Sequence, residues 1–149
     1  MLLEAMIAIL IFSLGILSLI ALQATAIKLT GDAKYRTDAT LLANRLIGQM
    51  WVRGADLAAL KTDFESPAGA AYAAWLADPN KNGVQDRLPG VVAEGTGVVA
   101  TLPQVTVDLI PTGAPTSAQV TITLFWRTPE MNGNDRHRHI VATRIAKNL

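Results

Sequence analysis

One carboxylate stands apart from every other charge in this sequence. Glu4 opens a stretch that carries no further charged residue until Lys28. A charged group at membrane depth is costly and is usually paired or functional. An acid in the first turn of a helix also has a simpler role, because it complements the positive end of the helix dipole. The position of Glu4 among apolar neighbours favours a functional role, and it is the side chain that we single out.

A second group of oxygen-bearing residues lies in the segment 78–86. Asp and Asn alternate there and a Gly and a further Asp follow, as at the start of an EF-hand calcium loop. The expected oxygen ligands are Asp78, Asn80, Asn82, Val84 (by its carbonyl) and Asp86. The twelfth position is Pro89, where such loops carry a bidentate Glu. An Asx-rich surface turn is the simpler alternative.

The remaining candidates point to no catalytic chemistry. His137 and His139 would share one face of a strand, but no nearby acid or Cys completes a metal site. Arg136, Arg138 and Arg144 make the end of the chain basic, yet the net charge of +1 argues against strong binding of nucleic acid. The sequence has no Gly-rich phosphate loop, no nucleophile elbow and no suitably spaced pair of carboxylates. We therefore predict no enzyme, and no cofactor apart from the possible calcium ion.

The first half of the chain is predicted to be one long helix. Residues 5–27 would span roughly 35 Å as a helix, which is enough to cross the core of a bilayer. Apolar residues then recur every three or four positions, at Ala39, Leu42, Leu46 and Met50. Gly54 is the first plausible terminator. We expect an apolar transmembrane segment over 1–27 and an amphipathic segment over 28–53.

The rest of the chain, 54–149, is long enough for one small domain. Asp56 is expected to cap a short helix that carries Leu57, Leu60 and Phe64 on one side, and residues 70–77 suggest another. Apolar alternation then predicts strands over 98–102, 105–110, 120–127 and 139–145. The expected fold class is α+β, with the long helix packed on an antiparallel sheet.

The residues at the N-terminus carry a resemblance to a known family. Leu2-Leu3-Glu4-Ala5-Met6-Ile7-Ala8-Ile9-Leu10, followed by Ser13-Leu14-Gly15-Ile16-Leu17 and Leu22-Gln23, resemble the mature N-terminus of type IV pilins. More narrowly, they are similar to the PilV family of minor pilins. The resemblance implies a type IV pilin fold. In this family a prepilin peptidase removes a basic leader and methylates the new amino group. The glutamate is normally the fifth mature residue, so we expect the natural N-terminus one residue before Met1.

The resemblance also implies a function, a location and partners. In this family, subunits are stored in the inner membrane with the head on the periplasmic side. They then enter a cell-surface pilus, where the segment 1–27 would lie in the filament core. Lys28, Lys34 and Arg36 follow the span and by the positive-inside rule favour the opposite topology, which the family resolves with its basic leader. The expected partners are other minor pilins, the major pilin, the assembly platform and the peptidase. Glu4 would pair with the amine of a neighbouring subunit.

Two alternatives stay open at this stage. A minor pseudopilin of a type II secretion system would share most of the N-terminal segment. A protein of another class, anchored in the envelope by a single span, would carry a head that binds a ligand or calcium. The sequence near Glu4 does not separate these three possibilities.

Overall fold

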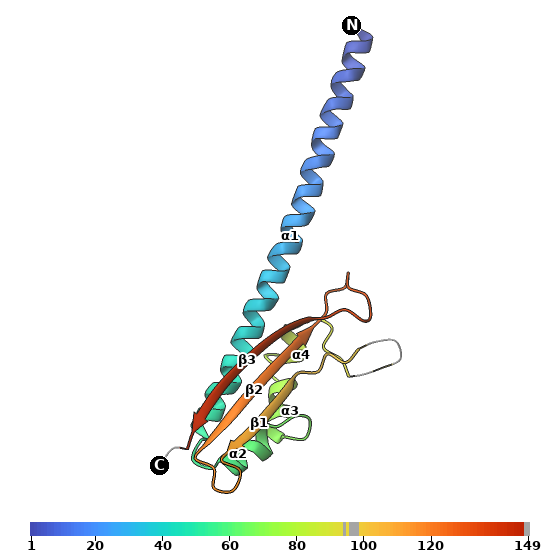
Figure 1. The fold of residues 1–149 in the computed structure, drawn as a ribbon. Coiled ribbons are helices and arrows are strands. Elements are labelled where there is room, and N and C mark those ends of the chain that lie inside the picture. Colours follow the sequence, from blue (N-terminus) through green and yellow to red (C-terminus); the bar gives the residue numbers. More distant parts are fainter. Residues whose placement is uncertain (94, 96–98, 148–149) are drawn as a thin grey trace. The chain divides into compact units, whose positions relative to one another are not determined.

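The computed structural model describes residues 1–93, 95 and 99–147. Helices and strands follow one another in the order drawn in Figure 1. The four helices of the described chain are α1 (Leu2–Val52), α2 (Leu57–Phe64), α3 (Ala70–Leu76) and α4 (Val84–Arg87). The three strands are β1 (Gln104–Ile110), β2 (Ser117–Trp126) and β3 (His137–Ala146). A long N-terminal helix and an antiparallel sheet give the α+β layout that the sequence predicts.

The chain has two compact units, Met1–Tyr35 and Arg36–Leu149. The predicted segments 1–27, 28–53 and 54–149 differ in the surroundings expected for each in a membrane or a filament. These segment boundaries stay a prediction. The unit boundary assigns most of the amphipathic half of α1 to the same unit as the sheet. That part of α1 is therefore an integral part of the head.

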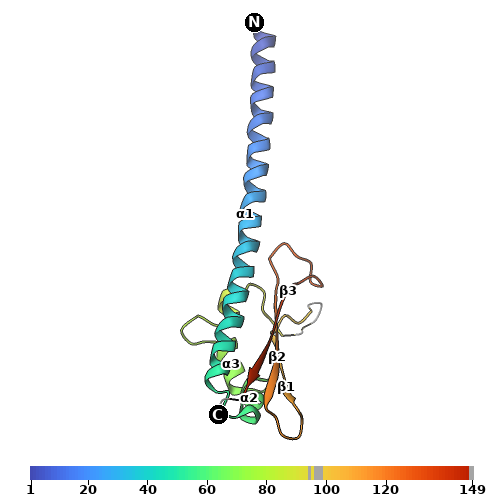
Figure 2. The same cartoon turned by 60° about the vertical axis from the view of Figure 1, so that its left-hand side comes forward.

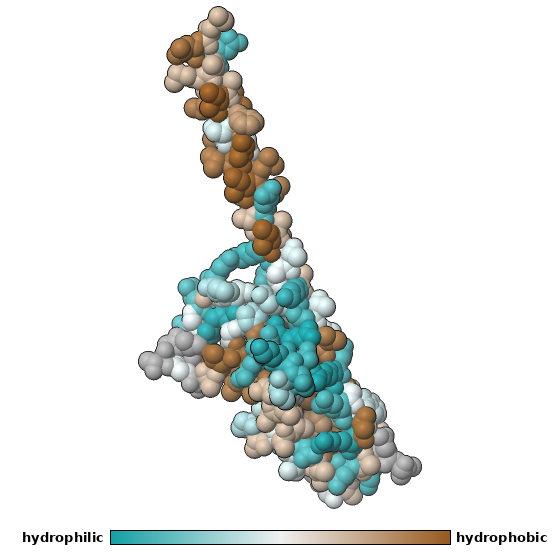
Figure 3. All heavy atoms as spheres, turned by 180° about the vertical axis from the view of Figure 1, so that it is seen from behind, coloured by the Kyte–Doolittle hydropathy of each residue, from teal (hydrophilic) through white to brown (hydrophobic). Residues whose placement is uncertain are grey.

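The first unit is a helix without a core of its own. Residues 1–30 are all exposed. Brown, hydrophobic side chains gather along this stretch of α1 in Figure 3. By length and composition α1 can cross a membrane. This unit has its apolar surface available for lipid or for other helices.

The second unit consists of helices on one face of a three-stranded sheet, which Figure 2 shows edge-on. The strand order is β1-β2-β3 and both pairings are antiparallel. The side of α1 that faces the core buries Ala39, Leu42, Ala43, Leu46 and Met50. The predicted helical periodicity is thereby confirmed. The predicted N-cap is confirmed too, since Asp56 accepts hydrogen bonds from the amides of Ala58 and Ala59.

The sheet has one buried face and one polar face. Alternate residues of β2 are fully buried toward the helices, among them Val120, Ile122 and Leu124. Val105 and Val107 of β1 continue the same buried face. The opposite face carries polar residues for most of its length, which is the usual division in an antiparallel sheet with one solvated side.

One predicted strand is wrong. Residues 99–102 form no strand, and Val98 lies outside the described residues. The amide of Thr101 donates to the carbonyl of Val92, and the Arg127 guanidinium donates to the carbonyl of Val99. The segment is held by loop residues instead of a neighbouring strand. Pro103, which follows it, has no N–H to offer a strand ladder.

The β1 edge of the sheet is hydrogen-bonded to a neighbouring segment of the chain. At the β1 edge, the amide of Ser66 donates to the carbonyl of Val105, and the Ser66 hydroxyl accepts from the Val105 amide. The Lys61 ammonium donates to the carbonyl of Val107. The outward N–H and C=O of Val105 and the outward C=O of Val107 are thus occupied by the segment that contains α2.

Candidate functional site

Glu4 lies in the first turn of α1, where the amide of Ala5 donates to the carbonyl of Met1. Its neighbours Leu2 and Leu3 are 80% and 72% exposed. The apolar surface around Glu4 is therefore uncovered. A carboxylate there would lose its water when such a surface packs against another helix, and it would then need a cation or a proton.

The proposed calcium loop is a network of internal hydrogen bonds. One oxygen of Asp78 accepts from the backbone amide of Asn80 at 2.9 Å, and the other accepts from Arg45 at 3.0 Å. The side-chain oxygen of Asn82 accepts from Arg87 at 3.0 Å. In the described part of the loop, these oxygens are directed at cationic or amide donors of the chain itself.

The second half of the loop is the short helix α4. The carbonyl of Val84, which the calcium hypothesis requires as a ligand, accepts from the amide of Leu88. A carboxylate oxygen of Asp86 accepts from the amide of Gly83 and thereby caps α4. Among the described residues there is no group of three or more His, Cys, Asp or Glu side chains that could hold a metal ion. Calcium binding here stays an untested prediction.

Gly83 has a different role from the glycine of an EF-hand loop. Its φ is −75°, so it does not supply a left-handed turn. A Cβ atom at this position would lie 2.6 Å from the backbone nitrogen of Asp78 and 2.8 Å from the carbonyl oxygen of Leu76. The glycine is needed because the two ends of the loop approach closely. The left-handed residue of the segment is Lys81, with a φ of 57°.

Arg45 connects this loop to α1. Its guanidinium donates to the Asp78 carboxylate and also to the carbonyl of Asn82, at 3.2 Å. The bond from the Asn80 amide and the bond from Arg45 hold the pKa of the Asp78 carboxyl below its ordinary value. Arg45 thus provides positive charge at the loop, in the role that the sequence suggested for calcium.

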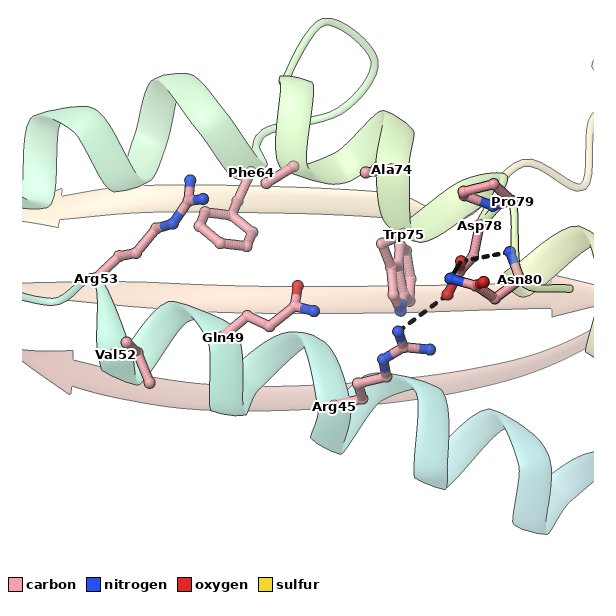
Figure 4. A pocket seen from close by; sticks show the side chains of 11 residues that line it. Arg45, Gln49, Val52, Arg53, Phe64, Ala74, Trp75, Asp78, Pro79 and Asn80 are labelled. Atoms are coloured by element: carbon pink, nitrogen blue, oxygen red, sulfur yellow. Dashed lines mark hydrogen bonds and ion pairs between the residues drawn. The ribbon is translucent and has the colours of Figure 1, made fainter. Parts of the chain in front are cut away.

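An open groove of about 510 Å³ lies beside this connection (Figure 4). In Figure 4, Arg45 and Gln49 extend from α1, and Arg53 from the turn that follows it, toward Phe64, Trp75 and Asp78 on the other wall. Arg53 pairs with Asp63 at 2.7 Å, and its guanidinium lies 5.6 Å from the centre of the Phe64 ring. The indole N–H of Trp75 donates to the carbonyl of Leu42. These contacts fasten α1 to α2 and α3, and both arginines already have carboxylate partners.

The sequence did not reveal this groove or the role of Arg45. Arg45 and Asp78 are 33 residues apart, and no local spacing relates them. The only sequence signal is that Arg45 flanks the apolar side of the helix at Leu42 and Leu46. A cation at the margin of a buried surface is well placed to pair with a polar group on the covering element.

The two histidines share one face of β3, as predicted, and it is the face toward the helices. The ring of His137 stacks on Trp126 with centroids 5.3 Å apart. The Nε2 atom of His139 lies 3.4 Å from the hydroxyl of Thr40 on α1. Their contacts are with the core and with α1, which agrees with a structural role.

Comparisons with protein families, with curated proteins and with solved structures find no match for this chain. The assignment of a function therefore depends on the residues themselves.

Proposed function

We propose that the chain is a minor pilin of the type IV class, a non-catalytic subunit that primes or modifies pilus assembly together with other minor pilins. The observation that carries the proposal is the stretch after Glu4. It is a helix with no further charge until Lys28, and residues 1–30 are all exposed. A helix of this kind needs a bilayer or a bundle of other helices to cover it.

The head supports the proposal in a second way. From Arg36 onward, α1 belongs to the compact unit that contains the sheet, and it buries Leu42, Leu46 and Met50 there. One continuous helix thus joins an apolar segment to a folded head. This is the organisation expected of a subunit with a type IV pilin fold, which is stored in the inner membrane and then carried into a filament.

The role proposed for Glu4 follows from the cost of a buried charge. In a filament core its carboxylate would lie among apolar helices, and the amine of a neighbouring subunit would be its partner. Removing one member of a buried ion pair costs about 3–5 kcal/mol. Glu4 would therefore select the position at which a subunit docks.

The experiment that tests the proposal is intact-mass analysis of the native protein from its host, with and without the prepilin peptidase. The expected result is peptidase-dependent loss of a leader and addition of one methyl group, at an N-terminus one residue before Met1. An unprocessed and unmethylated chain in both strains would contradict the proposal. The single-span envelope protein would then be the better description, and calcium titration of the head would be the next measurement.

A minor pseudopilin of a type II secretion system would give the same mass result. The two assignments differ in the assembly that contains the protein. Cross-linking in intact cells distinguishes them, because the protein should be recovered with pilus subunits in one case and with secretion components in the other.

A further inference from the structure

The outer edge of β3 has no partner strand in the described part of the chain. The order β1-β2-β3 places β3 at one side of the sheet, and its ten residues pair only with β2. An edge strand presents a row of backbone N–H and C=O groups that can pair with another extended chain. At the opposite edge, Ser66 and Lys61 already occupy the corresponding groups of β1.

The register shows which backbone groups of β3 point outward. The amide of Lys147 donates to the carbonyl of Thr116, a pair that continues the β2–β3 register. Because hydrogen bonding alternates along an antiparallel strand, the odd-numbered residues of β3 face β2. The even-numbered residues, including Ile140 and Ala142, direct their N–H and C=O groups away from the sheet. The bonds of Val105 and Val107 at the β1 edge fit the same alternation.

The side chains of these even-numbered residues define the chemistry of the edge. Arg138, Ile140, Ala142 and Arg144 all lie exposed on the polar face of the sheet. Two cations thus flank an apolar pair, with about 20 Å between the first and the last position. Arg144 donates to the hydroxyl of Ser117, and within the described chain neither arginine forms an ion pair.

We propose that the β3 edge is a docking site for an extended acidic segment of a different protein, which adds a fourth strand to the sheet. In antiparallel pairing, residues directly opposite each other share a face of the sheet. The partner would place acidic side chains opposite Arg138 and Arg144, six residues apart, and apolar side chains opposite Ile140 and Ala142. This inference goes beyond the proposed function and does not depend on it.

The same residues argue against a second copy of this chain as the occupant. In the symmetric antiparallel register centred on Val141, Arg138 of each copy would lie opposite Arg144 of the other. Like charges in direct opposition are destabilising. β3 carries no acidic residue, so no register between two copies of β3 places a carboxylate opposite Arg138 or Arg144. Edge arginines can also serve only to prevent self-association, and this is the alternative that the experiment must exclude.

The probe for the test is the synthetic peptide TETVTVTET, with TQTVTVTQT as its uncharged control and TKTVTVTKT as its charge-reversed control. Each is titrated into the full chain in detergent micelles, and amide hydrogen exchange is followed by NMR. The acidic peptide should slow exchange at Ile140, Ala142 and Arg144, whose amides point outward. The odd-numbered amides of β3 already bond to β2 and should change little. The glutamine peptide should bind about 2- to 30-fold more weakly, since two exposed ion pairs are lost.

Two variants and a control complete the experiment. R138E/R144E should reverse the preference, so that the lysine peptide becomes the tighter ligand. A142P should abolish binding, and because the Ala142 amide points away from β2, proline is tolerated there. K81E, which reverses a cation on the loop before α4, should bind as the unmodified chain does. If A142P does not fold, the charge reversal in R138E/R144E decides the matter.

Several results would overturn the proposal. Equal binding of the acidic and the uncharged peptide would show that the arginines give no specificity. Binding of heparin without protection of the even-numbered amides would mark a simple polyanion surface. Concentration-dependent protection without any peptide would make a second copy the occupant. If none of the three peptides binds, the edge is not a docking site, and the arginines serve only to prevent self-association.

Discussion

At the scale of single residues, the Asp78 carboxylate fixes both the conformation of its loop and the position of that loop on α1. It accepts from the amide of Asn80 within the turn and from Arg45 on α1. The first bond fixes the turn, and the second fixes the turn to the helix. Both bonds favour the charged form of Asp78, and they lower its pKa.

This lowered pKa predicts an acid-sensitive contribution to stability. An Asp whose pKa is lower in the folded state stabilises that state above the unfolded pKa, about 3.9, and the contribution is lost as the pH falls through the folded value. The free energy of unfolding should therefore fall more steeply below about pH 4 in the unmodified chain than in D78N. Thermal unfolding of the full chain in micelles between about pH 2.5 and 6 measures the difference. D135N, which removes an exposed carboxylate from the β2–β3 loop, is the control for loss of charge. Parallel pH profiles for the unmodified chain and D78N would contradict the prediction.

Two glycines should respond to the same substitution with opposite signs. Gly83→Ala would force a Cβ to within 2.6 Å of the Asp78 backbone, and we expect a loss of about 1–3 kcal/mol in the free energy of unfolding. Gly48→Ala meets no atom within 4 Å, and in a helix interior it should gain about 0.5–1 kcal/mol. Thermal denaturation of both variants checks the pair. Equal effects would mean that the loop ends are not held close together.

At the scale of elements, α1 contributes five side chains between Ala39 and Met50 to the core of the second unit. Leu46 is fully buried in the core, whereas Leu41 on the same helix is 55% exposed. Leu46→Ala should lower the free energy of unfolding by about 2–5 kcal/mol, because it removes buried contacts and leaves a cavity. Leu41→Ala should change it by less than about 0.5 kcal/mol. Chemical denaturation of the full chain in micelles gives both values. Comparable losses for the two variants would show that this part of α1 is not packed as described.

The elements with a strong internal period were predictable from the sequence. The apolar residues from Ala39 to Met50 recur at helical spacing, and α1 ends at Val52 close to the expected Gly54. Strands β1 and β2 follow from alternation, since a residue on the wrong face would expose an apolar side chain. In each case one repeated feature, burial on one side, determines both the element and its orientation.

Elements that depend on distant partners were not predictable in the same way. The residues from Val99 to Leu102 have the composition of a strand, but their hydrogen-bond partners lie in loops, at Val92, nine residues before Thr101, and at Arg127, 28 residues after Val99. The polar segment before Asp86 matches a calcium motif locally, while Arg45 reaches it from another helix. The type of a residue determines which hydrogen bonds it can form. Which partner it finds depends on the fold, because the partner can come from a distant part of the chain.

At the scale of the whole molecule, the two compact units differ in what covers their apolar surface. The unit Arg36–Leu149 buries its own core, including Ile122 and Leu124. The unit Met1–Tyr35 has large hydrophobic side chains exposed along its length. The second unit has a buried core of its own, whereas the apolar surface of the first is open to lipid or to other helices. A defect in assembly should therefore be separable from a defect in folding.

Glu4 is the residue at which this separation can be tested. If its carboxylate pairs with a neighbouring subunit in an apolar environment, Glu4→Ala should lower incorporation into surface filaments by at least about 100-fold, since removing one member of a buried ion pair costs about 3–5 kcal/mol. Glu4→Gln should be similarly impaired, because the amide has the same shape but no charge. Immunoblots that compare sheared filaments with membranes measure the incorporated fraction.

The head provides the control for this last prediction. Glu4 lies in the first unit, and the buried core of the second unit consists of residues from Ala39 onward. The thermal unfolding of the head should therefore be the same in Glu4→Ala as in the unmodified chain. Ser18→Ala, a change on the same apolar helix that removes no charge, should enter filaments normally. If Glu4→Ala entered filaments as well as Ser18→Ala did, Glu4 would be no more than an acid that complements the helix dipole, and docking would depend on apolar packing alone.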